Sequence, residues 1–282
     1  MKKRHIEESI VKFFMLLSLA LVAGSLGFIL LTVIVKGLPA LNLAMLTQTP
    51  KGGYYLGKEG GILNAIIGSL YLAIGATALA MLFSLPVALY LEAYARRSRW
   101  ADTVRITLDV LWGIPSIVYG AFGFTVMLAL GLRASLLGGI LTLTLLEIPI
   151  MTRAMDEVIR MMPFDLEQAS FALGSTRLEA AIHVVTRQML PGILTAILLA
   201  FGRGIGDAAS ILFTAGYTDR IPTSLFQPVA SLPLAVFFQL GTPFPEVQQR
   251  GYASALVLTA IILGISLGSR WVSSRLARFT IK

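Results

Sequence analysis

The chain has 282 residues, of which 56% are hydrophobic and only 13% are charged. A soluble domain carries roughly 25% charged residues, so this composition indicates an integral membrane protein. The net charge of +8 does not indicate nucleic-acid binding, because the basic residues stand at the ends of apolar runs, where they set membrane topology. Cysteine is absent, which excludes disulfides and thiolate metal sites.

Six apolar runs predict an all-α polytopic membrane protein with six transmembrane helices, because a helical crossing of the bilayer needs about 20 residues. The first run is longer than the apolar region of a secretory signal, so we expect an uncleaved helix. The second run contains Pro86 and is expected to be one tilted or kinked helix. The six helices are expected at about 13–35, 62–92, 110–132, 134–155, 188–215 and 251–272.

A further charge-free stretch, 221–245, is not counted as a crossing. It contains five prolines, and the backbone groups that prolines leave without partners cannot face lipid. We expect a loop outside the membrane, partly buried against the helices.

The distribution of Lys and Arg predicts that both termini lie inside the cell. With six crossings, sixteen of the 23 Lys and Arg residues fall in the inner segments and Arg203 falls within a helix. Only six fall in the outer loops, namely Lys36, Lys51, Lys58, Arg133, Arg220 and Arg250. The chain is therefore expected to be N-in and C-in, with the basic loop that holds Arg96, Arg97, Arg99 and Arg105 facing the cytoplasm.

The polar segment 163–187, here called the lever, is predicted to face the cytoplasm between the fourth and fifth helices. Pro163 and Asp165 are typical of a helix start, an apolar face follows, and Gly174 is expected to end the helix. A second helical stretch is expected from Thr176 to about Val185. A helix–Gly–helix unit of this kind inserts into a groove on a partner, or it lies on the membrane surface as an amphipathic connector.

Arg203 and Asp207 lie within the fifth apolar run. A charge at the centre of a membrane helix costs about 2.5–3.5 kcal/mol on insertion scales, and such charges face an interior or an aqueous path. The two residues are four apart, so they share one helix face and can pair. In one interpretation they form a neutralised pair that helps insertion and packing. In the other, Arg203 contacts a transported anion through its planar donor fork and Asp207 is its counter-charge.

Other motifs argue against an enzyme. Gly202, Gly204 and Gly206 do not form a nucleotide loop, because no strand precedes them and the spacing is GxGxG. No GxxxxGK[ST] motif occurs, so the chain is expected to hold no ATP site of its own. No metal cluster or nucleophile–base set has a workable spacing. Glu147, within the fourth run, is expected to have a structural role, with a place on a transport pathway as the alternative.

Over residues 60–280 the chain resembles the permeases of ATP-binding-cassette (ABC) importers, most closely the phosphate-specific ones. The matching phrases include LYLEAYARRSR (89–99), GIPSIVYGAFGF (113–124), QASFALGSTRLEAA (168–181) and LPGILTAILLAFGRGIGDAASILFTAG (190–216). The phrase PTSLFQPVASLP (222–233) resembles the A-type subunit of the phosphate permease heterodimer more than the C-type. Two departures are visible: Gln168 stands where the coupling motif has Glu, with Glu167 one place earlier, and Asp207 stands where the fifth helix has Glu.

The resemblance implies a type I ABC importer permease fold in a bacterial inner membrane, and a non-catalytic subunit that moves phosphate. It implies that the lever docks on a cytosolic ABC ATPase dimer, which binds the ATP and Mg²⁺, through Glu167, Gln168, Ala169, Leu173 and Gly174. It further implies a second permease subunit, a periplasmic phosphate-binding protein, and a phosphate pathway that includes Arg203 and Asp207. It also implies that the pairs formed by Arg153, Asp156 and Glu157 anchor the lever.

Two alternatives remain open from the residues alone. The first is a permease for another oxyanion, such as sulfate, molybdate or phosphonate, because one arginine binds any of them. The second is a secondary transporter that works without an ATPase, which predicts broken helices in both halves of the chain. Only the fifth run shows a glycine-rich break, which counts against the second alternative.

Overall fold

The computed structural model describes residues 2–51, 60–96 and 98–276, and its elements are helices. The basic residues Lys58, Arg97, Arg278 and Lys282, which entered the topology prediction, lie outside the described residues, as do the side chains of Lys2, Lys3 and Arg4. Four of the described helices are long and apolar enough to cross a membrane. Counting each of two sharply bent helix pairs as one span gives six.

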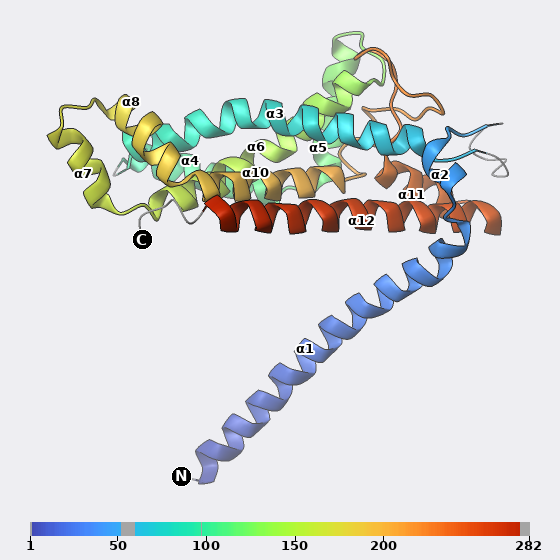
Figure 1. Ribbon diagram of the computed structural model, residues 1–282, viewed down its shortest axis with the longest axis horizontal. Helices are drawn as coiled ribbons and strands as arrows, with labels where there is room; N and C mark the ends of the chain where they lie inside the picture. The colour runs from blue at the N-terminus through green and yellow to red at the C-terminus, as the bar shows by residue number, and fades with distance from the viewer. Residues whose placement is uncertain (1, 52–59, 97, 277–282) are drawn as a thin grey trace.

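Four helices lie side by side along the length of the molecule: α3 (Leu63–Ala93), α6 (Leu136–Arg160), α10 (Leu190–Ile205) and α12 (Pro245–Leu276) (Figure 1). Helix α6 is the centre of this bundle, since 67% of its most apolar window is buried, against 39% for α3 and 22% for α12. Fully buried alanines on α3, including Ala76 and Ala80, let α6 approach closely. Small residues have this effect because there is little hydrophobic drive between helices in lipid, and association depends on close packing.

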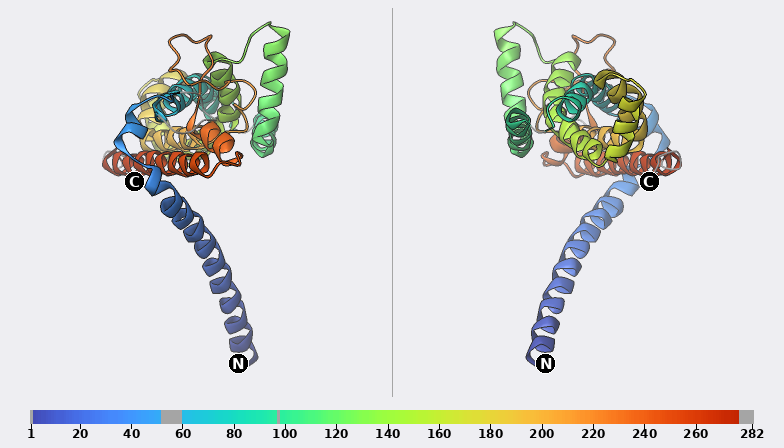
Figure 2. Two further views of the ribbon diagram at one scale, coloured as in Figure 1. Left: turned by 90° about the vertical axis from the view of Figure 1, so that its right-hand side faces the viewer. Right: turned by 90° about the vertical axis from the view of Figure 1, so that its left-hand side faces the viewer.

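Helix α1 (Lys2–Gly37) leaves the bundle at an angle and contacts it only near its own C-terminal end (Figures 1 and 2). None of its most apolar window is buried inside the chain. The contact is with α12, where Lys36 lies 5.0 Å from the centroid of the Tyr252 ring. A Cβ atom on Gly37 would overlap the backbone of Tyr252, so glycine permits this approach. A short connection follows, made of η1 (Leu38–Ala40) and α2 (Leu43–Thr47).

The third predicted helix, 110–132, is broken in the structure. Helix α4 (Arg99–Gly113) and helix α5 (Ser116–Ala129) meet at an angle of 96°. The break falls at Ile114, whose backbone is extended, and at Pro115. Proline disfavours helical geometry in the residue before it and lacks an N–H donor, so the helix ends there although the apolar run continues.

The fifth predicted helix, 188–215, is also shorter than expected. Helix α10 ends at Ile205, and residues 206–215 form turns that stay packed inside the bundle. At the other end, the helical residues 177–188 meet α10 at 76°. The turns at 206–215 approach α5 closely at Gly120, where a Cβ atom would lie 2.7 Å from the carbonyl oxygen of Ala209.

The proline-rich stretch 221–245, predicted to be a loop, contains the buried helix α11 (Leu232–Leu240). Ser231 caps it by accepting a hydrogen bond from the Leu234 N–H, and Pro233 sits in the first turn, where a missing N–H costs nothing. Helix α12 then begins at Pro245, before the predicted start of the sixth helix.

The lever lies at one end of the bundle, beside the C-terminal ends of α3 and α12, while α2 and α11 lie at the opposite end (Figure 1). It consists of α7 (Phe164–Ala172), α8 (Arg177–Glu179), the π-helical segment η2 (Ala180–Val185) and α9 (Thr186–Gln188).

Candidate functional site

The lever folds as α7 followed by one helical stretch that runs from α8 through α9. Its sequence carries a signal that ends the first helix and a signal that begins the second. Gly174 adopts a φ of +87°, a left-handed conformation that suits glycine, and the turn is closed by the bond from the Ser175 N–H to the Ser170 carbonyl. Thr176 and Glu179 then form a reciprocal capping box at the start of α8. The hydrogen bonds from Thr176 lower the pKa of the Glu179 carboxyl below its ordinary value.

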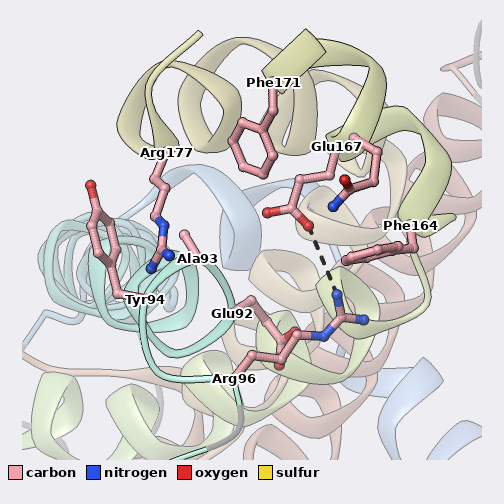
Figure 3. A pocket seen from close by; sticks show the side chains of 9 residues that line it. Glu92, Ala93, Tyr94, Arg96, Phe164, Glu167, Phe171 and Arg177 are labelled. Atoms are coloured by element: carbon pink, nitrogen blue, oxygen red, sulfur yellow. Dashed lines mark ion pairs between the residues drawn. The ribbon is translucent and has the colours of Figure 1, made fainter. Parts of the chain in front are cut away.

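A groove of about 630 Å³ separates the lever from the C-terminal end of α3 (Figure 3). It divides the five predicted coupling residues into two groups. Glu167 and Gln168 line the groove, whereas Ala169, Leu173 and Gly174 are exposed away from it. Leu173 is 90% exposed and forms the apolar tip of the lever.

An ion-pair network lies next to this groove and was not predicted. Arg105 is buried and donates two hydrogen bonds to Asp156, at 2.9 and 3.0 Å, and one to Glu92, at 2.7 Å. These contacts join the C-terminal ends of α3 and α6 to α4. Arg105 was predicted to lie in a basic loop, but it is a residue of α4. The buried residues of that helix are Ala101, Arg105 and Leu108, which follow helical spacing. That spacing was the signal in the sequence that could have shown that Arg105 is buried on one face of a helix.

The prediction that Arg153 helps to anchor the lever is wrong, because its ion-pair partners do not lie on the lever. It pairs with Asp109 at 2.7 Å, with Asp156 at 3.0 Å and with Glu157 at 3.4 Å. These pairs tie α6 to α4 and to its own next turn, and none of the three reaches the lever. The sequence showed the charges on α6 but not that the facing helix would be α4.

Arg203 and Asp207 lie where α10 ends. The Arg203 Nη2 and Asp207 Oδ2 atoms are 3.9 Å apart, which is the outer limit of an ion pair. The Arg203 side chain is 57% exposed and the Asp207 side chain is 5% exposed. Asp207 Oδ1 accepts a hydrogen bond of 2.8 Å from the Ser210 N–H, so this carboxylate caps the turn that follows α10. The guanidinium is therefore only loosely held and its donors remain available.

Glu147 lies one helix away and is fully buried. Its Oε2 atom accepts a hydrogen bond of 2.8 Å from the Thr77 hydroxyl, and its Oε1 atom has no hydrogen-bond partner in the described part of the chain. That second oxygen faces Gly204, the residue next to Arg203. Glu147 thus links α3, α6 and α10 at the level of the Arg203–Asp207 pair.

Gly204→Ala is expected to destabilise the protein by about 1–3 kcal/mol, since the new methyl group would overlap the Glu147 carboxylate. Gly202→Ala is the matched control, because a Cβ atom at Gly202 meets nothing within 4 Å. Replacing an unconstrained helical glycine by alanine stabilises by roughly 0.5–1 kcal/mol. The thermal unfolding midpoint in detergent measures both. Equal midpoints for the two variants would show that Gly204 is not a close-contact position.

Residues 84–281 match the family described as "Binding-protein-dependent transport system inner membrane component". The chain is 35% identical to a phosphate transport system permease protein PstA from Xylella fastidiosa, covering 85% of this chain and 83% of the relative. It is 32% identical to the PstA of Yersinia pestis, covering 88% and 83%, and to PstA 1 of Mycobacterium tuberculosis strain H37Rv, covering 99% and 92%.

Solved structures give the same fold at lower identity. The MetNI methionine ABC transporter, in an inward-facing conformation, aligns with a TM-score of 0.63 at 17% identity, covering 76% of this chain and 95% of the other. An amino acid ABC transporter with histidines aligns with a TM-score of 0.54 at 17% identity, covering 77% and 92%. These alignments, with the family match, confirm the predicted all-α fold of type I ABC importer permeases, whereas the six crossings and the N-in, C-in orientation stay predictions. The chain belongs to the family of inner membrane components of binding-protein-dependent transport systems.

Proposed function

We propose that this chain is the permease subunit of an ATP-driven phosphate importer. The observation that carries the proposal is its similarity, over nearly the whole length, to three phosphate permeases at 32–35% identity. The chain would be non-catalytic, with ATP and Mg²⁺ bound by a separate ABC ATPase dimer. The similarity favours phosphate over sulfate, molybdate or phosphonate, and favours an ATPase-driven importer over a secondary transporter.

We place the chain in a bacterial inner membrane with six crossings and both termini in the cytoplasm. The bundle end that carries the lever also holds the C-terminal ends of α3 and α6 and the helix α4 (Figure 1). These segments, with the residues that follow α3, carry Arg96, Arg99, Arg105, Arg153 and Arg160. Positive charge concentrates on the cytoplasmic side of membrane proteins. The opposite end, with α2 and α11, then faces the periplasm and meets the phosphate-binding protein.

The lever is proposed to dock on the ATPase through its exposed tip. Leu173 is a large apolar side chain at a glycine-terminated helix end, and Met161 and Phe164 are exposed apolar residues at the opposite end of α7. A short helix with such anchors fits a groove on a partner protein. Ala169 and Gly174 complete the docking surface, while Glu167 and Gln168 contribute from the groove side.

A second permease subunit is proposed to cover the face that carries Arg203. Charges at membrane depth face a protein interior or an aqueous path, yet Arg203 is exposed on this chain alone. The pathway would therefore run between the two permeases. The apolar faces of α1 and α5, which the bundle leaves uncovered, provide further surface for this partner and for lipid.

Phosphate recognition would depend on how loosely Arg203 is held. The guanidinium fork can donate two parallel hydrogen bonds to a phosphate. Asp207 is fixed by the Ser210 N–H, so its charge stays near the guanidinium without a close ion pair. A nearby negative charge weakens anion binding, which favours release of phosphate into the cytoplasm.

Reconstitution tests the proposal. The chain, co-expressed with its permease and ATPase partners and placed in liposomes, is expected to take up phosphate only when both ATP and the loaded phosphate-binding protein are supplied. Excess sulfate or molybdate should not compete. Uptake driven by an ion gradient without ATP would contradict the mechanism, and competition by sulfate would contradict the substrate.

A further inference from the structure

Helix α7 contributes no buried residue to the fold, so the protein core does not hold it in place. The segment after it does pack, because Val185 of η2 joins the buried cluster of Met155 and Ile159 on α6. The lever is thus anchored at its C-terminal half and lies over an open groove at its N-terminal half. Helix α7 contacts η2 on one side, and across the groove its contact with the end of α3 is a surface one.

Arg96 makes that contact. It follows the end of α3, and its Nη1 atom lies 3.8 Å from Glu167 Oε2 on α7. Its guanidinium carbon lies 5.6 Å from the centroid of the Phe164 ring, within the range of a cation–π interaction. Figure 3 shows the Arg96 side chain reaching from the α3 side toward both Glu167 and Phe164. One side chain therefore meets two residues in the first turn of the lever.

Behind Arg96 the ion-pair network continues into the bundle. The Arg96 Nε atom lies 3.3 Å from Glu92, and the other oxygen of Glu92 is bound by Arg105 at 2.7 Å. Arg105 is in turn bound to Asp156 on α6. A displacement of α7 is thus transmitted through Arg96 and Glu92 to the ends of α3, α4 and α6.

We propose that Arg96 is a positioning residue that clamps α7 to the end of α3 and so transmits lever movement to the transmembrane bundle. The inference rests on the proposed function, since it assigns the link between ATPase and pathway within this chain. It also gives Glu167 an intramolecular role, as the partner of Arg96.

The contact is partly exposed, and surface ion pairs contribute little to folding. Its removal is therefore expected to leave the complex assembled while weakening coupling between the lever and the pathway. Coupling between two sites typically changes the binding affinity at one of them by a factor of roughly 5 to 150, and we take the lower end of this range as a guide. For Arg96→Gln we expect the amount of phosphate transported per ATP hydrolysed to fall about fivefold or more.

The experiment compares Arg96→Gln, Glu167→Gln and the double variant in reconstituted complex, measuring phosphate uptake and ATP hydrolysis on the same liposomes. The ratio of phosphate transported to ATP hydrolysed should be no lower in the double variant than in the more impaired single variant, because each single substitution already removes the Arg96–Glu167 contact. Arg96→Lys, which keeps the charge, should recover part of the ratio. Arg99→Gln is the matched control, since Arg99 is an exposed arginine at the nearby start of α4.

The outcomes separate this inference from the proposed function. If the unaltered complex shows no ATP-dependent phosphate uptake, the proposed function fails. If it transports normally and Arg96→Gln keeps the same ratio of phosphate to ATP, the positioning role of Arg96 is refuted. Additive losses in the double variant would also refute it, because they would mean that Arg96 and Glu167 act independently.

Discussion

Arg203→Ala should lower phosphate uptake by roughly 10- to 150-fold, the loss expected when a hydrogen bond to a charged group worth about 1.5–3 kcal/mol is removed. The side chain is exposed on this chain and makes only a 3.9 Å pair with Asp207, so truncation removes little that holds the fold together. Uptake into liposomes at saturating ATP and binding protein measures the effect. Co-purification of the complex shows whether assembly is intact.

Two further variants sharpen this test. Arg203→Lys keeps the charge and loses the planar fork, so we expect uptake between that of Arg203→Ala and that of the unaltered chain. Arg270→Ala is the control, because Arg270 is exposed near the end of α12 and should leave uptake unchanged. Normal uptake by Arg203→Ala in an assembled complex would remove Arg203 from the phosphate pathway.

Asp156→Ala is expected to destabilise the protein by about 3–5 kcal/mol, because it takes the main partner from the buried Arg105 guanidinium. For a chain of this size each kcal/mol lowers the unfolding midpoint by about 2–4 °C, so the expected loss is at least about 6 °C. A thermal unfolding curve in detergent measures it. Glu92 still contacts Arg105 but cannot replace the two hydrogen bonds from Asp156.

The control and the rescue use the same network. Asp109→Ala breaks the exposed pair with Arg153 and should cost no more than about 1 kcal/mol. The double variant Arg105→Met with Asp156→Leu should recover much of the loss, because apolar residues of similar volume replace buried ion pairs well. Glu92 keeps Arg96 and Arg160 as partners in that variant. A double variant as unstable as Asp156→Ala would show that the unpaired charge is not the cause.

The helices of the bundle could be predicted where an apolar run and a helix coincide, as in α3. The breaks between helices could not be predicted, because proline interrupts the helix at one position and not at another. Pro86 and Pro149 lie inside continuous helices, whereas Pro115 ends one. In a membrane bundle, neighbouring helices satisfy the backbone groups that a proline frees, so the outcome depends on tertiary packing and not on local sequence.

The candidate site was predictable only in part for the same reason. The spacing of Arg203 and Asp207 predicted a shared helix face, but α10 ends between them at Ile205, and the turn sets their separation instead. Arg105 was counted as a topogenic charge. Its partner Asp156 is 51 residues away in the chain, so no local pattern reveals that it is buried.

The burial of α6 has a consequence for biosynthesis. Its most apolar window has a mean hydropathy of only 1.4, compared with 2.4 for α1. Acidic residues in a transmembrane segment oppose its partition from the translocon into lipid, and α6 carries two that are fully buried, Glu147 and Asp156. Thr77 of α3 and Arg105 of α4 bind these two carboxylates, and both helices are synthesised before α6. The nascent chain thus supplies the partners first, and α6 enters the membrane against helices that are already there.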